Sequence, residues 1–457
     1  MKKALRKCKG NACNAFLLNS KANILTIFPH LKLISLNYLL FVVYGVVFCM
    51  LLMRSSFITN SGLNSRMILL LFMFKAIAGI AIGWLSLHFY NTGNDYWDVN
   101  REGWKEYQLL WSNPHDYFTN IFRSAYPNGY AGLFDSFQSF WNDLKNNLII
   151  KLVSVFNIFS RGNYYINSLF FNFIVFFGHV ALYRVFIKIY RGQTYRVIIG
   201  CFLLPSLLYF SSGIHKDGIV FLMLAILVYA VFMSLQKNKF NLKRIAIIAM
   251  ALLILFLTRN FVCIALLPAL TAWILSAKIK APPLISFAVV YLLAGLLFFN
   301  FNSIFPAADP LKTIVEKQSD FLQLPHPSTA IQLDTLYPRF SSFMHNAPQS
   351  FNHLLMRPYL MELPSTILLP MNIELFIYQL LFIIFLFFHK RDQNINRDTF
   401  IPFAIFFTLT VFLFIGYIVP NLGSLIRYRS LYLPYIITPI LCCIDLERLR
   451  ALLKVKK

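Results

Sequence analysis

The sequence predicts an all-α, polytopic integral membrane protein with about 11 transmembrane helices. This prediction follows from the composition, from the length of the apolar runs and from the charges that separate them. Of the 457 residues, 58% are hydrophobic and 13% are charged, and the mean hydropathy is +0.62. Soluble domains carry about 25% charged residues. The composition therefore excludes a water-soluble fold.

Apolar runs of sufficient or nearly sufficient length define the spans. A helix needs roughly 20 apolar residues to cross the hydrocarbon core of a bilayer. Because several runs are shorter, we expect some to extend into their flanks or to end in shallow re-entrant turns. The predicted spans are residues 33–53, 67–90, 164–187, 197–212, 218–235, 245–258, 261–277, 284–300, 366–388, 400–420 and 431–444. They form a single membrane domain, 33–444, between a basic N-terminal segment, 1–32, and a basic tail, 445–457.

Four connections between the predicted spans are strongly basic. Together they contain 13 Lys or Arg and only two acids. Basic loops stay on the cytoplasmic side of a membrane, so we expect these connections and the tail to be cytoplasmic. The four connections are residues 184–196, 236–244, 278–283 and 389–399.

Two long loops, 91–163 and 301–365, are then predicted to face outward. Thirteen of the 18 acidic residues lie on this outer side, where we expect the functional site. Short apolar stretches in the loops, such as 147–158, predict interfacial helices rather than spans. Counting the predicted spans backward from 164–187 places segment 1–32 on the outer side, although this segment is basic. This conflict with the positive-inside rule stays open.

The net charge is +24, from 42 Lys or Arg and 18 Asp or Glu. In a soluble chain this excess would suggest a nucleic-acid partner. Here the basic residues cluster between apolar runs, which is typical of topology selection, so we expect no nucleic-acid partner. The seven cysteines lie outside both long loops, so no disulfide framework or thiolate metal site is expected.

The first candidate site follows span 67–90, in the sequence GNDYWD. Asp95 comes within a few residues of the predicted membrane surface, and Asp98 follows in a DxxD spacing. A carboxylate at the lip of an apolar cavity is partly desolvated, which raises its pKa toward that of a useful general base. The neighbouring aromatic rings suit a sugar face or the interfacial belt. The alternative is an ordinary loop or N-cap carboxylate.

The second candidate site is LLPSLLYFSSGIHKDGIVFL, residues 203–222. Pro205 and a glycine interrupt the apolar run, and His215, Lys216 and Asp217 precede the next predicted helix. A lysine beside the free backbone N–H groups of a helix N-terminus makes a phosphate site. In the alternative, Asp217 is an N-cap and Lys216 reaches lipid headgroups.

The third candidate site is IVPNLGSLIRYRSLYLP, residues 418–434, which we interpret as a tight outer turn. Arg427 and Arg429 lie two residues apart there, and two guanidiniums bind a phosphate or pyrophosphate bidentately. Arg259, alone between two apolar runs on the same predicted side, is a further candidate. Anchoring to lipid headgroups is the alternative for the pair, and it is the favoured interpretation of Arg259.

Two ionisable residues, Lys75 and Glu374, lie inside apolar spans, where such side chains are functional candidates. Their estimated depths differ, so the sequence does not predict that they pair. The nine histidines show no metal-binding spacing, and no P-loop or dinucleotide motif is present. We therefore expect no metal, no cofactor and no ATP-driven transport.

In their order, these motifs resemble those of membrane proteins from bacterial polysaccharide clusters. A span with an embedded Lys75, then GNDYWD, a long loop, PSLLYFSSGIHKD and NLGSLIRYR are similar to polytopic glycosyltransferases of the GT-C type and to oligosaccharide-repeat-unit polymerases. The resemblance covers residues 67–440 in architecture, but only short motifs in residue identity. It implies that Asp95 is the catalytic base and that Arg427 and Arg429 hold a lipid pyrophosphate. The second acid of the family's DxD or DE pair is absent.

The predicted function is that of a glycosyltransferase of the cell inner (cytoplasmic) membrane, acting in surface polysaccharide or glycoconjugate assembly. Its partners would be a polyprenyl-phosphate- or pyrophosphate-linked sugar donor and a glycan acceptor. Such a donor carries a good leaving group, so one carboxylate and a few cations suffice for catalysis. Single-sugar transfer and repeat-unit polymerisation both stay open. The rival functions are a transporter or flippase of lipid-linked saccharide, and a non-catalytic scaffold.

Overall fold

The computed structural model describes residues 36–89, 94–122, 140–279, 282–306, 309–323, 329–359, 362, 369–390 and 399–454. The predicted basic segment 1–32 lies outside these residues, as do parts of both long loops and the last residues of the tail. Within the described part of the chain all regular elements are helices, and there are two isolated β-bridges besides. The predicted all-α class is therefore confirmed.

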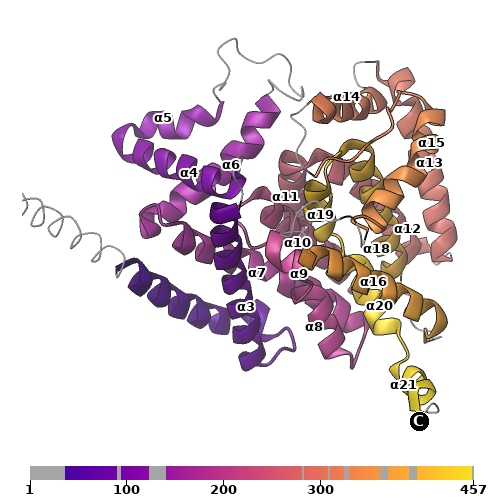
Figure 1. Cartoon of the computed structure of the whole chain (residues 1–457), viewed down its shortest axis with the longest axis horizontal. Helices are drawn as coiled ribbons and strands as arrows, with labels where there is room; N and C mark the ends of the chain where they lie inside the picture. The colour runs from indigo at the N-terminus through magenta and orange to yellow at the C-terminus, as the bar shows by residue number, and fades with distance from the viewer. Residues whose placement is uncertain are drawn as a thin grey trace, which may run out of the picture.

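The bundle is built from helices of very different lengths (Figure 1). They are Leu36–Arg54, α2 (Ser56–Thr59), α3 (Ser65–Phe89), α4 (Asp95–Ser112), α5 (Pro114–Thr119), η1 (Asn120–Phe122), α6 (Phe140–Ser160), α7 (Tyr164–Ile189), α8 (Thr194–Phe202), α9 (Pro205–Phe210), α10 (Lys216–Gln236), α11 (Leu242–Thr258), α12 (Asn260–Ile279), α13 (Pro283–Ile304), α14 (Pro310–Gln323), α15 (Phe340–Leu355), α16 (Leu369–Phe387), α18 (Phe400–Ile418), α19 (Leu422–Ser430), α20 (Pro434–Cys443) and α21 (Leu446–Lys454).

Eight of these helices are long and apolar enough to cross a membrane, which makes the chain a multi-pass membrane protein. They are Leu36–Arg54, α3, α7, α10, α12, α13, α16 and α18. The predicted count of 11 is not shown by the described residues, because three of the predicted spans correspond to helices too short to count as candidate spans. Span 245–258 corresponds to α11, which has 17 residues. Spans 197–212 and 431–444 are interrupted or shortened by proline.

Two breaks between consecutive helices have the same construction. In the first, α8 ends at Phe202 and α9 begins with Pro205 at its first position. In the second, α19 ends at Ser430 and α20 begins with Pro434. Proline lacks the N–H that would continue the ladder, and it restricts the residue before it, so each helix breaks and restarts. The broken helices pack in pairs, α8 against α20 and α9 against α19, near the centre of the bundle (Figure 1).

Described residues from the four predicted basic connections lie near one another at one end of the bundle, here called the basic end. Lys188 donates to the side chain of Gln236 at 3.0 Å, and Arg196 donates to the carbonyl of Ile444 at 3.0 Å. His389 and Ile444 form one of the β-bridges. These contacts are consistent with the predicted grouping of the basic connections on one side. Helix α21 projects from this end (Figure 1).

The described parts of both long loops lie at the opposite end, here called the site end. Helices α4, α5 and α6 come from the first loop, and α14 and α15 come from the second (Figure 1). The predicted interfacial stretch 147–158 lies within α6, which packs along α4 and is not among the candidate spans. The second loop also holds the start of α19, since Ile331 donates to the carbonyl of Pro420 at 2.9 Å.

Burial is uneven across the spans. About two thirds of the most apolar window of α7 and of α10 is buried inside the chain, against 6% for α13 and 11% for Leu36–Arg54. The core therefore sits around α7 and α10, and the two least buried helices form rims that face hydrocarbon. Because α10 is central, its N-terminal residues are held from several sides.

The division into two ends predicts the labelling of single cysteines in a cysteine-free variant. Lys105→Cys in α4 and Lys312→Cys in α14 are exposed at the site end, and Arg448→Cys in α21 is exposed at the basic end. We expect a membrane-impermeant maleimide added to intact cells to label the first two, and Arg448→Cys only after permeabilisation. Labelling of all three before permeabilisation, or of Arg448→Cys alone, would contradict the predicted orientation.

Candidate functional site

Asp217 is the centre of a buried ion cluster at the site end. Its side chain is 1% exposed, and both of its carboxylate oxygens are occupied. The Arg259 guanidinium donates to Oδ1, and Arg427 Nε donates to Oδ2 at 2.5 Å. The two arginines come from segments 42 and 210 residues away. A buried carboxylate is stable only with such counter-charges, so this contact ties three distant parts of the chain together.

Arg427 contacts three of the site residues at once. Besides Asp217, its Nη1 donates to Asp95 Oδ2 at 3.1 Å, and its Nη2 lies 2.6 Å from His215 Nε2. The Asp95 side chain is 53% exposed, whereas that of Asp217 is almost fully enclosed. The two carboxylates therefore differ in kind: Asp217 is structural, and Asp95 is open to a ligand.

His215 lies between the two carboxylates as the N-cap residue of α10. Its Nδ1 is 3.0 Å from Asp217 Oδ2, and its Nε2 is 3.9 Å from Asp95 Oδ2. Burial, reinforced by the positive charge of Arg427, lowers the pKa of His215 from 6.5 to about 4. A neutral ring with its proton on Nδ1 satisfies both the Asp217 and the Arg427 contacts. His215 is therefore uncharged near neutral pH.

Further cations surround this cluster. Lys216 is repelled by the positive charges of Lys145, Arg259 and Arg427. It is attracted by the carboxylate of Asp217. It makes no hydrogen bond or ion pair with any residue that the structure describes. Burial and the charges of Lys317 and Arg259 lower the pKa of Lys145 to about 8. The site thus collects positive charge from both long loops.

Lys317 places the second long loop against the cluster. Its Nζ donates to Asn260 Oδ1 at 3.1 Å, next to Arg259 in the chain. Burial lowers the pKa of this lysine, while Asp320 acts in the opposite direction. The Nε of Arg259 is buried and has no hydrogen-bond partner among the described residues. The cluster therefore retains an unused donor in its interior.

Aromatic rings line the same site. The Arg259 guanidinium stacks 3.9 Å from the centre of the Tyr428 ring, and Arg427 lies 5.8 Å from the Tyr96 ring. Tyr96 also meets His215 edge-on. Gly213 makes room for Tyr96, because a Cβ at this position would lie 2.4 Å from the ring. A side chain at position 213 would push α4, and Asp95 with it, away from Arg427.

The intramembrane Lys75 and Glu374 do not pair with each other; they hold opposite ends of α9. At the N-terminus, the backbone N–H and the hydroxyl of Ser206 donate to the Glu374 carboxylate at 3.0–3.1 Å. At the C-terminus, Lys75 donates to the hydroxyls of Ser211 and Ser212, at 2.9 and 3.2 Å. An acceptor at the start of a helix and a donor at its end satisfy groups that a short helix leaves without an internal partner. This short helix leads directly into His215.

Arg429 does not join the site, contrary to the predicted arginine pair. Its guanidinium is 3% exposed and donates to the backbone carbonyls of Leu354 and Arg357. The predicted turn is in fact helix α19, and residues two apart on a helix point about 200° away from each other. Arg427 and Arg429 therefore face opposite sides. Arg429 anchors the end of α15.

Asp98 also lies outside the cluster. It is paired with Arg101 on the exposed side of α4. Of the residues singled out from the sequence, the structure brings together Asp95, His215, Lys216, Arg259 and Arg427. The structural role of Asp217 and the parts played by Lys145 and Lys317 were not anticipated. The available signal in the sequence was that Arg259, alone between two apolar runs, lies on the same predicted outer side as Asp217.

The arrangement is suited to an anionic ligand beside a carboxylate. Within the described part of the chain, no three His, Cys, Asp or Glu side chains converge as a metal site. No protein-family model, no curated protein and no solved structure matches this chain. The site therefore stands on its own geometry, within a membrane protein of about eight candidate spans.

The different burial of the two carboxylates predicts different costs of removing them. Asp217→Asn leaves Arg259 and Arg427 buried without a counter-charge, so the free energy of unfolding should fall by about 3–5 kcal/mol. Asp95→Asn breaks one half-exposed pair and should cost under about 1 kcal/mol. Denaturant unfolding of the purified proteins in one detergent measures both. Equal losses would show that Asp217 is not the structural centre.

His215 predicts a pH dependence of stability. Its pKa is lower in the folded protein, about 4, than the ordinary 6.5, so the folded state binds fewer protons. Its contribution is complete above about pH 6.5 and is lost as the pH falls toward 4. The melting temperature should therefore fall less between pH 7 and pH 5 in His215→Gln than in the wild type. His115→Gln, which alters an exposed histidine, should keep the wild-type slope.

Proposed function

We propose that this protein is an integral membrane glycosyltransferase of the cell inner membrane, resembling the GT-C type and the repeat-unit polymerases. It would transfer sugar from a polyprenyl-phosphate- or pyrophosphate-linked donor at the site end. The observation that supports this most directly is the convergence of Lys216, Arg259 and Arg427 beside the half-exposed carboxylate of Asp95. Cations next to a carboxylate suit a leaving phosphate and an attacking hydroxyl.

In the proposed reaction, Asp95 removes the proton from an acceptor hydroxyl. The acceptor oxygen attacks the anomeric carbon of the donor sugar and forms the new glycosidic bond. The bond between that carbon and the phosphate oxygen breaks, and the electron pair leaves with the phosphate or pyrophosphate. Lys216 and Arg427 stabilise the negative charge that develops there. Tyr96 and Tyr428 supply ring faces beside the cations.

The buried residues have positioning roles in this proposal. Asp217 fixes the directions of Arg259 and Arg427, and Gly213 allows Tyr96 to lie against the α9–α10 turn. Because neither carboxylate oxygen of Asp217 is free, it is not the base. Arg429, which was predicted to bind phosphate with Arg427, has no part in the proposed reaction.

A transporter or flippase of lipid-linked saccharide is the second candidate. One observation favours it: two proline-broken helices, α8–α9 and α19–α20, pack side by side and lead into the site. Discontinuous helices of this kind surround the binding sites of many transporters. Such a protein would use the same cations to bind phosphate, but it would not need Asp95.

The proposal predicts separate losses of activity and stability. Purified protein would be incubated with lipid-linked oligosaccharide from its own source, and the products resolved by mass. Asp95→Asn should lower the rate by about 10²–10⁴-fold without loss of protein, because it removes the base. Lys216→Gln should lower it by about 10²-fold, also without loss of stability, because Lys216 has no partner in the described structure.

Glu102→Gln is the matched control, since it removes an exposed carboxylate from the same helix, and its activity should be unchanged. A ladder of repeat units would indicate a polymerase, and one added sugar a single-sugar transferase. Full activity of Asp95→Asn would exclude it as the base. Lipid-linked glycan that moves between leaflets of vesicles without a new product would favour the flippase. A protein that tolerates all these changes without loss would be a scaffold.

A further inference from the structure

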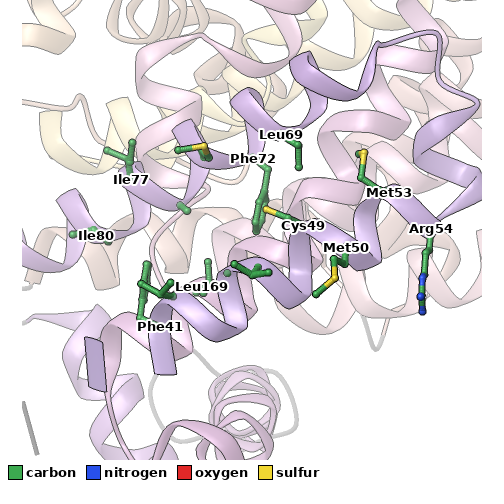
Figure 2. A pocket seen from close by; sticks show the side chains of 15 residues that line it. Phe41, Cys49, Met50, Met53, Arg54, Leu69, Phe72, Ile77, Ile80 and Leu169 are labelled. Atoms are coloured by element: carbon green, nitrogen blue, oxygen red, sulfur yellow. The ribbon is translucent and has the colours of Figure 1, made fainter. Parts of the chain in front are cut away.

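A cavity of about 700 Å³ lies between the helix Leu36–Arg54 and α3, away from the ion cluster. Its lining is apolar, and Arg54 is the one charged residue among the 15 that form it. Figure 2 shows Phe41 and Ile80 toward one side and Arg54 at the other. Several lining side chains, such as Val46 and Met73, are more than half exposed, so the cavity is a groove open to hydrocarbon.

Glycine at position 45, which lines the groove, is not needed for close packing against the rest of the described chain. A Cβ at this position would meet no atom within 4 Å. Glycine is less favourable than alanine inside a helix. By contrast, Gly79 and Gly83 of α3 face neighbours that a Cβ would strike at 2.4 and 2.3 Å. Gly45 thus leaves space that no described part of this chain fills.

Two exposed arginines stand at one end of the groove. Arg54 ends the first helix, and Arg66 lies one turn before the lining residue Leu69, on the same stripe of α3. Neither guanidinium has a hydrogen bond or ion pair with the residues that the structure describes. Phe57, in the connection between them, accepts from Arg184, so this is the basic end.

We propose that this groove binds one anionic phospholipid from the leaflet at the basic end. An acyl chain lies along the apolar lining past Gly45, and the phosphate lies between Arg54 and Arg66. The charge complementarity decides the occupant, since a zwitterionic lipid gains less from two guanidiniums and an uncharged chain gains nothing from them. Basic sites between transmembrane helices on the cytoplasmic side bind anionic headgroups. The site is independent of the proposed transferase reaction.

Native mass spectrometry of the delipidated full-length protein tests the proposal. Phosphatidylglycerol and phosphatidylcholine with identical acyl chains are titrated, and bound lipid is counted. We expect the wild type to prefer phosphatidylglycerol. Arg54→Gln and Arg66→Gln should each weaken that binding by about fivefold, with little effect on phosphatidylcholine. Gly45→Leu fills the groove and should weaken both lipids. Lys243→Gln, an exposed cation elsewhere at the basic end, should bind as the wild type does.

Three results would overturn the assignment. One is an unchanged preference for phosphatidylglycerol in the double variant Arg54→Gln/Arg66→Gln. Another is unchanged binding in Gly45→Leu. The third is a polyprenyl phosphate that these variants release while phosphatidylglycerol stays bound, since the groove would then hold a carrier lipid instead. Because the affected side chains are exposed or face open space, loss of folding is not expected, and a melting curve checks it.

Discussion

The burial of one carboxylate governs the arrangement of the site end. Asp217 sits in a region that water does not reach, and two guanidiniums and an imidazole surround it. Removing one partner of a buried pair leaves an uncompensated charge, which costs several kcal/mol. The start of α10, the turn at Arg259 and helix α19 therefore cannot shift independently. The half-exposed Asp95 and the partly buried Lys216 take their positions from this fixed frame.

A second set of polar contacts, at the two ends of helix α9, supports the ion cluster around Asp217. Helix α9 has only six residues, and a helix this short is not stable alone. Glu374 accepts from the Ser206 N–H at its start, and Lys75 donates to the Ser211 carbonyl at its end, so both satisfy backbone groups that a longer helix would bond internally. Each of these side chains comes from a different span, so α3 and α16 both contact the segment that leads into His215. Two ionisable residues inside the membrane thus serve the site without touching its ligand face.

The long spans were predictable because a bilayer demands about 20 consecutive apolar residues, a signal that sequence carries directly. The helix breaks at α8–α9 and α19–α20 were not predicted. A proline in the sequence marks a possible break, but it does not show whether the chain continues in the same direction after it. Arg429 was assigned to the site because a turn was expected at residues 418–434. A helix forms there instead, and it directs Arg429 away from Arg427. Lys145 and Lys317 were missed because nothing local shows which loops approach each other in space.

The order in which the charges appear along the chain has a consequence for biogenesis. Asp217 emerges from the ribosome before Arg259, and Arg427 follows 210 residues after Asp217. Until α19 inserts, Asp217 has one guanidinium instead of two, and Arg429 cannot yet anchor α15. Helix α19 therefore completes the charge compensation of a residue that precedes it by 210 positions. A nascent chain that stalls before α19 has an incompletely neutralised interior and is less stable, and unstable states are exposed to chaperones and proteases in the cell.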